Sequence, residues 1–241
     1  MMKAYEIPEG GRQARGMAIV NLLNLEKDES VSAIIPIDSY NPKENLIFVT
    51  RQGITKRTEL SQLKNIRKNG IIAITLKDND ELISVRRTDG NKELIVVTKK
   101  GMAIRFDEND VRAMGRNAAG VKAITLNDGD IVVAADLVKD NNYLVVITEL
   151  GFGKKTPLEE YRTQIRGGKG VITYNIKDKT GDIVSAKVID KEDEIMMISL
   201  SGTIIRIKGE DISTMGRSTQ GVTLMKMNDD KVVAVAKYVE D

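Results

Sequence analysis

The sequence predicts an all-β protein built from repeated, propeller-like blades. A basic residue stands three or four residues before a glycine that begins an apolar run, and this arrangement occurs five times. The glycines lie at positions 16, 70, 120, 170 and 221, so successive copies are 54, 50, 50 and 51 residues apart. Repetition at such a period is typical of solenoids and propellers. Each period also holds about four short β-rich runs between Gly, Asn and Asp turns, which is the content of one propeller blade.

Residues 45–93 show the order of elements expected in one unit. A β-rich strand at 46–50 is followed by a glycine turn and a more polar strand at 54–58. A polar connection then leads to an apolar strand at 71–76, an acidic turn and a fourth strand at 81–86. These assignments follow because Val, Ile and Thr are enriched in strands, whereas Gly, Asn and Asp favour turns.

The same order recurs to the end of the chain. We expect first strands at 94–98, 144–148 and 195–199, and third strands at 121–126, 171–176 and 222–227. The sequence therefore predicts a single domain, 1–241, with a partial blade at 1–44 and complete blades at 45–93, 94–142, 143–194 and 195–241.

The partial blade has strands predicted at 16–21 and 31–37 but no leading strand. A chain that opens in mid-blade indicates a piece of a longer protein, because a closed ring hides strand edges and an interrupted one exposes them. The alternative interpretation is a natural arc-shaped solenoid.

Composition excludes several kinds of chemistry. The chain has 241 residues with no Cys and no His, so disulfides, the usual zinc sites, Cys nucleophiles and His acid–base catalysis are all excluded. We expect no catalytic residue, no metal site and no cofactor in this chain. No apolar run is long enough to span a membrane as a helix. The 37 basic and 35 acidic residues give a net charge of only +2, so a nucleic-acid partner must be argued from where the charges lie.

The repeated basic residues are the first candidate site. At equivalent corners of successive blades they would form an interrupted positive belt on the rim, suited to the phosphates of bent duplex DNA. The alternative for any single copy is an arginine that caps backbone carbonyls or is simply solvated. The residues of the predicted belt are Arg12, Arg15, Arg67, Lys68, Arg116, Arg166, Lys169 and Arg217.

The densest basic site lies at residues 162–170. Two adjacent glycines would let backbone N–H groups approach an anion that the basic side chains surround. A P-loop is excluded, because the G-x-x-x-x-G-K-[ST] pattern and a βαβ unit are both absent. No base-reading helix is predicted and aromatic residues make up only 4%, which argues against sequence-specific and single-strand binding. The candidate residues here are Arg162, Gln164, Arg166, Gly167, Gly168, Lys169 and Gly170.

With these features, the chain resembles the C-terminal domain of the A subunit of DNA gyrase, a type IIA DNA topoisomerase. Residues 164–170 are similar to the Q-R-R-G-G-[KR]-G box of that family, with Ile165 where the family usually has Arg. The resemblance covers essentially the whole chain. Further similar stretches are 18–23, 112–116, 153–156 and 216–221.

The resemblance implies a six-bladed β-pinwheel whose blades exchange strands and whose basic perimeter binds and wraps duplex DNA. Wrapping would direct negative supercoiling by the full enzyme, an ATP-dependent isomerase. DNA breakage, rejoining and ATP hydrolysis would reside in the other regions of gyrase A and in gyrase B, which are the implied protein partners. The implied location is the bacterial cytoplasm, at the nucleoid, without a membrane.

One departure from the family pattern concerns the position of the box. The family box lies in the first blade, whereas residues 164–170 lie in the third complete unit. By repeat counting the chain corresponds to the second to sixth blades, with a box-like copy in the fifth. Two alternatives stay open: the related domain of topoisomerase IV, and a propeller-like scaffold for protein interactions. An enzymatic role is disfavoured by the absence of His and Cys.

Overall fold

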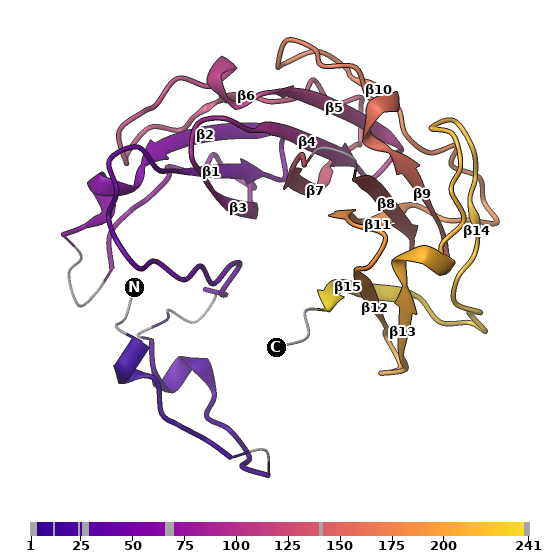
Figure 1. Ribbon diagram of the computed structural model, residues 1–241, viewed down its shortest axis with the longest axis horizontal. Helices are drawn as coiled ribbons and strands as arrows, with labels where there is room; N and C mark the ends of the chain where they lie inside the picture. The colour runs from indigo at the N-terminus through magenta and orange to yellow at the C-terminus, as the bar shows by residue number, and fades with distance from the viewer. Residues whose placement is uncertain are drawn as a thin grey trace.

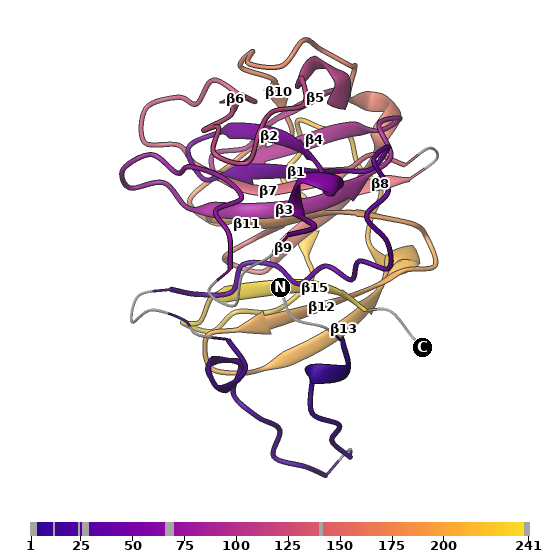
Figure 2. The same cartoon turned by 90° about the vertical axis from the view of Figure 1, so that its left-hand side faces the viewer.

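The structure is a computed structural model that describes residues 4–11, 13–23, 25, 29–65, 70–139 and 142–238. Within these residues, fifteen strands form four antiparallel sheets. The sheets follow one another along an open arc, and the first residues of the chain, in indigo, extend away from them (Figure 1). The same separation is visible after a 90° turn (Figure 2). The predicted all-β, propeller-like fold is confirmed.

Each of the first three sheets has four strands. The first sheet has the spatial order β3 (Leu82–Thr88), β1 (Asn45–Thr50), β2 (Ile54–Glu59) and β6 (Val121–Lys122). The second has the order β10 (Val171–Ile172), β5 (Met102–Asp107), β4 (Glu93–Thr98) and β7 (Val132–Leu137). The third has the order β11 (Ile183–Ile189), β8 (Tyr143–Thr148), β9 (Phe152–Pro157) and β14 (Val222–Thr223).

The fourth sheet, as far as the described residues go, has three strands: β13 (Ile204–Lys208), β12 (Glu194–Ser199) and β15 (Val232–Tyr238). The remaining regular elements are 3-10 helices of three or four residues. They are η1 (Ala4–Glu6), η2 (Ile19–Asn21), η3 (Leu60–Leu63), η4 (Glu108–Asp110), η5 (Leu158–Glu160) and η6 (Gly209–Asp211).

Neighbouring sheets are joined by strand exchange. The third strand of each later unit pairs with the second strand of the sheet before it: β6 with β2, β10 with β5 and β14 with β9. These exchanged strands lie on the outer, convex side of the arc, whereas β3, β7 and β11 lie nearer its inside (Figure 1). The segment before each exchanged strand is therefore held against the neighbouring blade, on the outside of the molecule.

The exchange explains where the predicted strands were wrong. The expected third strands at 121–126, 171–176 and 222–227 are each only two residues long, because the chain then crosses the glycine turn of its partner; for example, Ala123 N donates to Gly53 O at 2.8 Å. Residues 71–76 form no strand, since the described part of the first unit offers no second strand for them to pair with. For the same unit, the strands expected at 16–21 and 31–37 are absent: the first stretch contains η2 and the second is irregular.

The first strands of the units form the centre of the core. Side chains of a strand alternate between its two faces. Leu94 and Val96 of β4 therefore join a cluster shared with the first sheet, while Ile95 and Val97 join one shared with the third. All four are buried. Each such side chain stabilises the fold by about 1.5–3 kcal/mol. Burial on both faces explains why these strands are continuous apolar runs rather than alternating ones.

Candidate nucleic-acid interface

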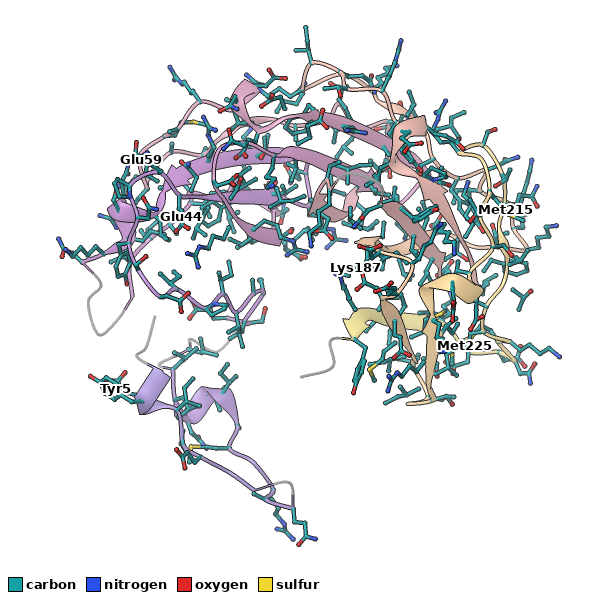
Figure 3. The ribbon with its side chains drawn as sticks, viewed as in Figure 1. Tyr5, Glu44, Glu59, Lys187, Met215 and Met225 are labelled. Atoms are coloured by element: carbon teal, nitrogen blue, oxygen red, sulfur yellow. The ribbon has the colours of Figure 1, made fainter. Side chains whose placement is uncertain are left out.

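Three turns on the convex side of the arc contain candidate residues, and these turns occupy equivalent positions in successive blades. They are residues 115–120, 165–170 and 216–221, which we call the rim turns, and each leads directly into an exchanged strand. Met215, next to the third rim turn, lies on the outer side of the arc, whereas Lys187 of β11 points into its hollow (Figure 3). The strand exchange thus places one basic turn on the outside of each of three successive blades.

The arginine of each rim turn binds the preceding unit. Arg116 Nη1 donates to Ile72 O at 3.4 Å, and Arg217 Nη1 donates to Ile172 O at 3.1 Å. Arg166 donates from Nη1 to Lys122 O at 3.0 Å and from Nε to Asp110 O at 2.9 Å. Residues 72, 122 and 172 are equivalent positions, so the rim turns are linked in series. The carbonyl-capping interpretation is therefore correct, but a guanidinium has five N–H donors, and those not used here can bind an anion.

The glycine that ends each rim turn is required by two constraints at once. Gly120 has φ +96° and Gly221 has φ +71°, a region that L-residues with a side chain rarely adopt. A Cβ on Gly120 would lie 2.5 Å from Thr55 O, and one on Gly221 would lie 2.5 Å from Gly153 O. The repeated glycine thus marks the place where the chain crosses closely over the second strand of the neighbouring sheet.

The box-like rim turn, residues 165–170, is held from below by Thr125. Thr125 N donates to Gly168 O at 2.8 Å, and Thr125 Oγ1 donates to Gly167 O at 2.7 Å. Gly167 N itself donates to Ala123 O at 2.6 Å. This N–H is already engaged, contrary to the expectation that both glycines would offer their N–H groups to an anion. The positive φ of Gly167, +83°, allows the turn to follow this path.

The side chains of the box-like region divide into exposed and inward-facing groups. Arg162 and Lys169 are exposed, as is Ile165, whose exposed fraction is 83%. Gln164 is half-buried; its backbone N donates to Arg105 O at 2.8 Å, and its Nε2 is buried without a hydrogen-bond partner. Gly168 is exposed and Gly170 half-buried. The charged groups that reach the surface here are therefore Arg162, Lys169 and the outer part of Arg166.

The remaining predicted belt residues are not brought together with these. Arg12, Arg67 and Lys68 lie outside the described residues. Arg15 is exposed, but it belongs to the first residues of the chain, which extend away from the sheets (Figure 1). Of the predicted belt residues, the structure thus places Arg116, Arg166, Lys169 and Arg217 in the rim turns of three successive blades.

Two buried lysines beneath the rim turns were missed from the sequence. Lys56 of β2 and Lys154 of β9 have no exposed surface. Lys154 Nζ donates to Gly216 O and to Arg217 O, both at 2.6 Å, and burial lowers the pKa of each of these two lysines to about 8. The sequence signal was a lysine at a strand position where the other units have an isoleucine, such as Ile104.

The acidic turns also have a role that the sequence did not reveal. Asp130 Oδ1 accepts hydrogen bonds from Lys100 N at 2.9 Å and from Ile131 N at 2.8 Å. Asp80 does the same for Gln52 N and Glu81 N, at 2.8 and 2.9 Å. These carboxylates close turns by binding backbone N–H groups. Asp230 binds Ser201 N and Lys231 N in the same way, whereas the third complete unit has Thr180 at this position. The carboxylates are thus structural features of three blades, which separates them from the basic rim.

The described residues contain no cluster of three or more Asp or Glu side chains that could hold a metal ion. Among the same residues, none of the helices is long and apolar enough to cross a membrane. The surface with a repeated, charged arrangement is that of the rim turns.

Antiparallel four-stranded blades that exchange strands along an arc, each with a basic turn on its outer side, define a propeller-like repeat domain. The chain belongs to the family described as DNA gyrase C-terminal domain, beta-propeller. The match covers residues 1–38, 44–89, 92–139, 142–190 and 193–237.

Relatives agree with this assignment. The A subunit of DNA gyrase from Halalkalibacterium halodurans is 59% identical over 239 residues, and that from Clostridium acetobutylicum is 52% identical over 241 residues. The chain is covered to 99% and 100% in these two alignments, but it spans only 29% of either relative's length.

Two solved structures have the same fold. The C-terminal domain of DNA topoisomerase IV has a TM-score of 0.87 at 33% identity, over 92% of this chain and 70% of that one. The DNA gyrase A C-terminal domain has a TM-score of 0.85 at 28% identity, over 99% of this chain and 78% of that one.

Proposed function

We propose that this chain binds duplex DNA along its convex rim without sequence specificity and wraps it, as the C-terminal domain of gyrase A. The observation that carries the proposal is the recurrence of an arginine-bearing rim turn at the same outer position of successive blades. Phosphates recur at regular intervals along DNA, so cations spaced along a curved rim match a bent duplex.

The chemistry of the rim favours contacts to the phosphate backbone over contacts to bases. The helices of the described residues are 3-10 turns of three or four residues, too short to lie in a major groove as a recognition helix. The basic groups that reach the surface at the box-like turn or just before it are Arg162, Lys169 and the outer part of Arg166, and such groups bind phosphate oxygens well. Affinity should therefore depend steeply on salt and little on sequence.

Within the full enzyme, this domain would steer DNA rather than react with it. The other regions of gyrase A, together with gyrase B, would carry out breakage, rejoining and ATP hydrolysis, and negative supercoiling would follow from the direction of wrapping. We place this activity in the bacterial cytoplasm, at the nucleoid, with no cofactor bound by this chain. The gyrase A relatives at 52% and 59% identity support this assignment.

The alternative is the corresponding role in topoisomerase IV. It is supported by the TM-score of 0.87 to the C-terminal domain of that enzyme. The two roles differ in topology: a wrapping domain changes the linking number of DNA that is sealed while bound, whereas a domain that only binds DNA does not. A measurement of the linking number therefore tests wrapping separately from binding.

The test uses the chain with a duplex of about 40 base pairs and with a nicked plasmid. Binding is measured by fluorescence anisotropy at several salt concentrations, and the plasmid is ligated in the presence of protein to measure its linking number. We expect the logarithm of the binding constant to fall linearly with the logarithm of the salt concentration, and the linking number of the ligated plasmid to shift. Binding that is absent or insensitive to salt would contradict the DNA-binding proposal. Binding with an unchanged linking number would contradict wrapping only.

A matched pair of double variants locates the interface. Arg162→Ala with Lys169→Ala removes two exposed cations at the box-like turn, whereas Lys77→Ala with Lys179→Ala removes two exposed cations at the acidic turns. Each lost phosphate contact should reduce the salt slope by about 1, so the first pair should lower it by about 2. An equal loss in both pairs would show that net charge, not the rim, determines binding.

A further inference from the structure

The two buried lysines hold the rim turns from inside the protein. Lys154 Nζ donates to Gly216 O and Arg217 O at 2.6 Å and lies 3.1 Å from Thr219 Oγ1, so it binds three acceptors of one rim turn. Lys56 Nζ binds one acceptor of the first rim turn, Arg116 O, and also donates to Ala73 O of the preceding unit at 2.5 Å. In both cases the carbonyl of the rim arginine itself is bound.

These lysines are not needed to build a blade. The equivalent positions on β5 and β13 are occupied by Ile104 and Ile205, and the second and fourth sheets form with these apolar side chains. Under the box-like turn, the side chain of Ile104 would lie 3.7 Å from a Cβ at Gly168, so the turn with two glycines packs directly on it. A buried ammonium is expensive to desolvate and is retained only where it contributes something else.

The groups around each ammonium make it a source of positive potential at the rim. Lys154 faces Arg217, Glu160 and the ring of Tyr174, whose centroid is 5.4 Å away. Lys56 faces Arg116 and the ring of Phe48 at 5.7 Å. In both sites the neighbouring rim arginine has the same charge as the lysine. Two neighbouring positive charges repel each other. A phosphate bound at the surface above them would offset this repulsion, because it attracts both charges.

We propose that Lys56 and Lys154 are positioning residues of the DNA-binding rim: each binds the backbone carbonyl of a rim arginine, fixes this arginine at the surface and adds a positive charge beneath it. This inference rests on the proposed function for its effect on DNA, but the positioning itself can be measured without DNA. The box-like turn is held in place without such a lysine: its two glycines bind Thr125 through their carbonyl oxygens.

The test compares Lys154→Met with Lys155→Met, a control that the chain itself offers. Lys155 is the next residue on β9, is also buried, and donates from Nζ to Gly209 O at 2.5 Å and to Glu210 O at 3.2 Å, so it holds η6 and not a rim turn. Both substitutions remove one buried positive charge. Circular dichroism and thermal melting confirm that each variant is folded.

The first readout is hydrogen exchange in the absence of DNA. Lys154→Met should accelerate exchange in residues 216–221 and leave residues 165–170 unchanged, whereas Lys155→Met should leave both rim turns unchanged. Unaltered exchange of residues 216–221 in Lys154→Met would overturn the positioning role, whether or not the protein binds DNA. A wild-type chain that binds no DNA would instead overturn the proposed function.

The second readout is DNA affinity as a function of pH. A pKa of about 8 means that Lys56 and Lys154 lose their charge as the pH rises through 8, while most lysines stay charged. The DNA affinity of the wild type and of Lys155→Met should fall between about pH 7 and 9.5, and this fall should be smaller in Lys154→Met. At neutral pH, Lys154→Met should bind DNA about tenfold more weakly than the wild type, which is the effect of losing one charge-assisted contact. If the variants do not fold, the wild-type profile decides: a flat profile over this range would overturn the proposal.

Discussion

At the scale of single residues, the rim combines exposed cations with side chains that serve the backbone. Arg166 illustrates both, because it donates to two carbonyls of the preceding unit while part of it reaches solvent. Asp130 shows that acidic residues in the turns bind N–H groups and do not merely balance charge. The role of Arg166 in the fold can therefore be separated from its proposed role toward a ligand.

The rim glycines give a prediction at this scale. Gly120 and Gly90 have nearly the same φ, +96° and +90°, but a Cβ on Gly120 would meet Thr55 O at 2.5 Å whereas one on Gly90 would meet nothing within 4 Å. Gly90→Ala should destabilise the fold by about 1–2 kcal/mol through left-handed strain. Gly120→Ala should add about 1–3 kcal/mol of overpacking. Urea unfolding of both variants measures the difference; equal losses would mean that strain alone explains the repeated glycine.

At the scale of elements, the sequence predicted the strands whose partners are local. The first strand expected at 94–98 is β4, Glu93–Thr98, and the one expected at 195–199 is β12, Glu194–Ser199. The third strands were overestimated because their partner lies in another unit and takes only two residues of them. Strand exchange is a feature of the tertiary structure, and the apolar pattern of a single strand contains no information about its partner.

The same limit applies to the candidate site. The sequence predicted which rim residues are basic, but an alternating strand does not tell whether Lys154 points outward or beneath a turn. Its orientation depends on the carbonyls of Gly216 and Arg217, which are more than sixty residues away in the chain. The buried lysines could therefore only be recognised once the turns above them were placed.

An ion pair on the inner strands gives the prediction at the element scale. Asp136 of β7 accepts from Arg86 Nε of β3 at 2.9 Å and from Val188 N of β11 at 3.2 Å, so one carboxylate joins three successive sheets. Asp136→Asn should destabilise the protein by about 1–3 kcal/mol, because it removes the charge that pairs with Arg86 and replaces one of the two acceptor oxygens by an NH2 donor.

The matched control for this ion pair is Glu81→Gln. Glu81 binds Arg51 at 3.1 Å, but both side chains are largely exposed, at 65% and 42%. Exposed pairs contribute about 0–1 kcal/mol, so this variant should be nearly neutral. Chemical denaturation in low and high salt measures the loss of stability of each variant relative to the wild type. We expect a loss that persists in high salt only for Asp136→Asn. A similar small effect in both would mean that the inner strands do not depend on this carboxylate.

At the scale of the whole molecule, the curvature of the arc and the position of the rim turns are consequences of the same strand exchange. Each exchanged strand both joins two sheets and carries the preceding turn to the convex side (Figure 1). A ligand that contacts several rim turns must therefore follow the curve. For duplex DNA this requires bending, which has a free-energy cost that the rim cations must offset.

Bending leads to the last prediction, which concerns the flexibility of the DNA. Smooth bending of a site of 20–30 base pairs by 40–90° costs about 1–6 kcal/mol. A duplex of this length with a central nick bends more easily, so the chain should bind it more tightly than the intact duplex of the same sequence. Anisotropy titrations at one salt concentration measure the ratio of the two affinities. Arg162→Ala with Lys169→Ala should weaken binding to both duplexes and reduce this ratio, because fewer contacts hold the bend, and equal wild-type affinities would show that the rim binds DNA without curving it.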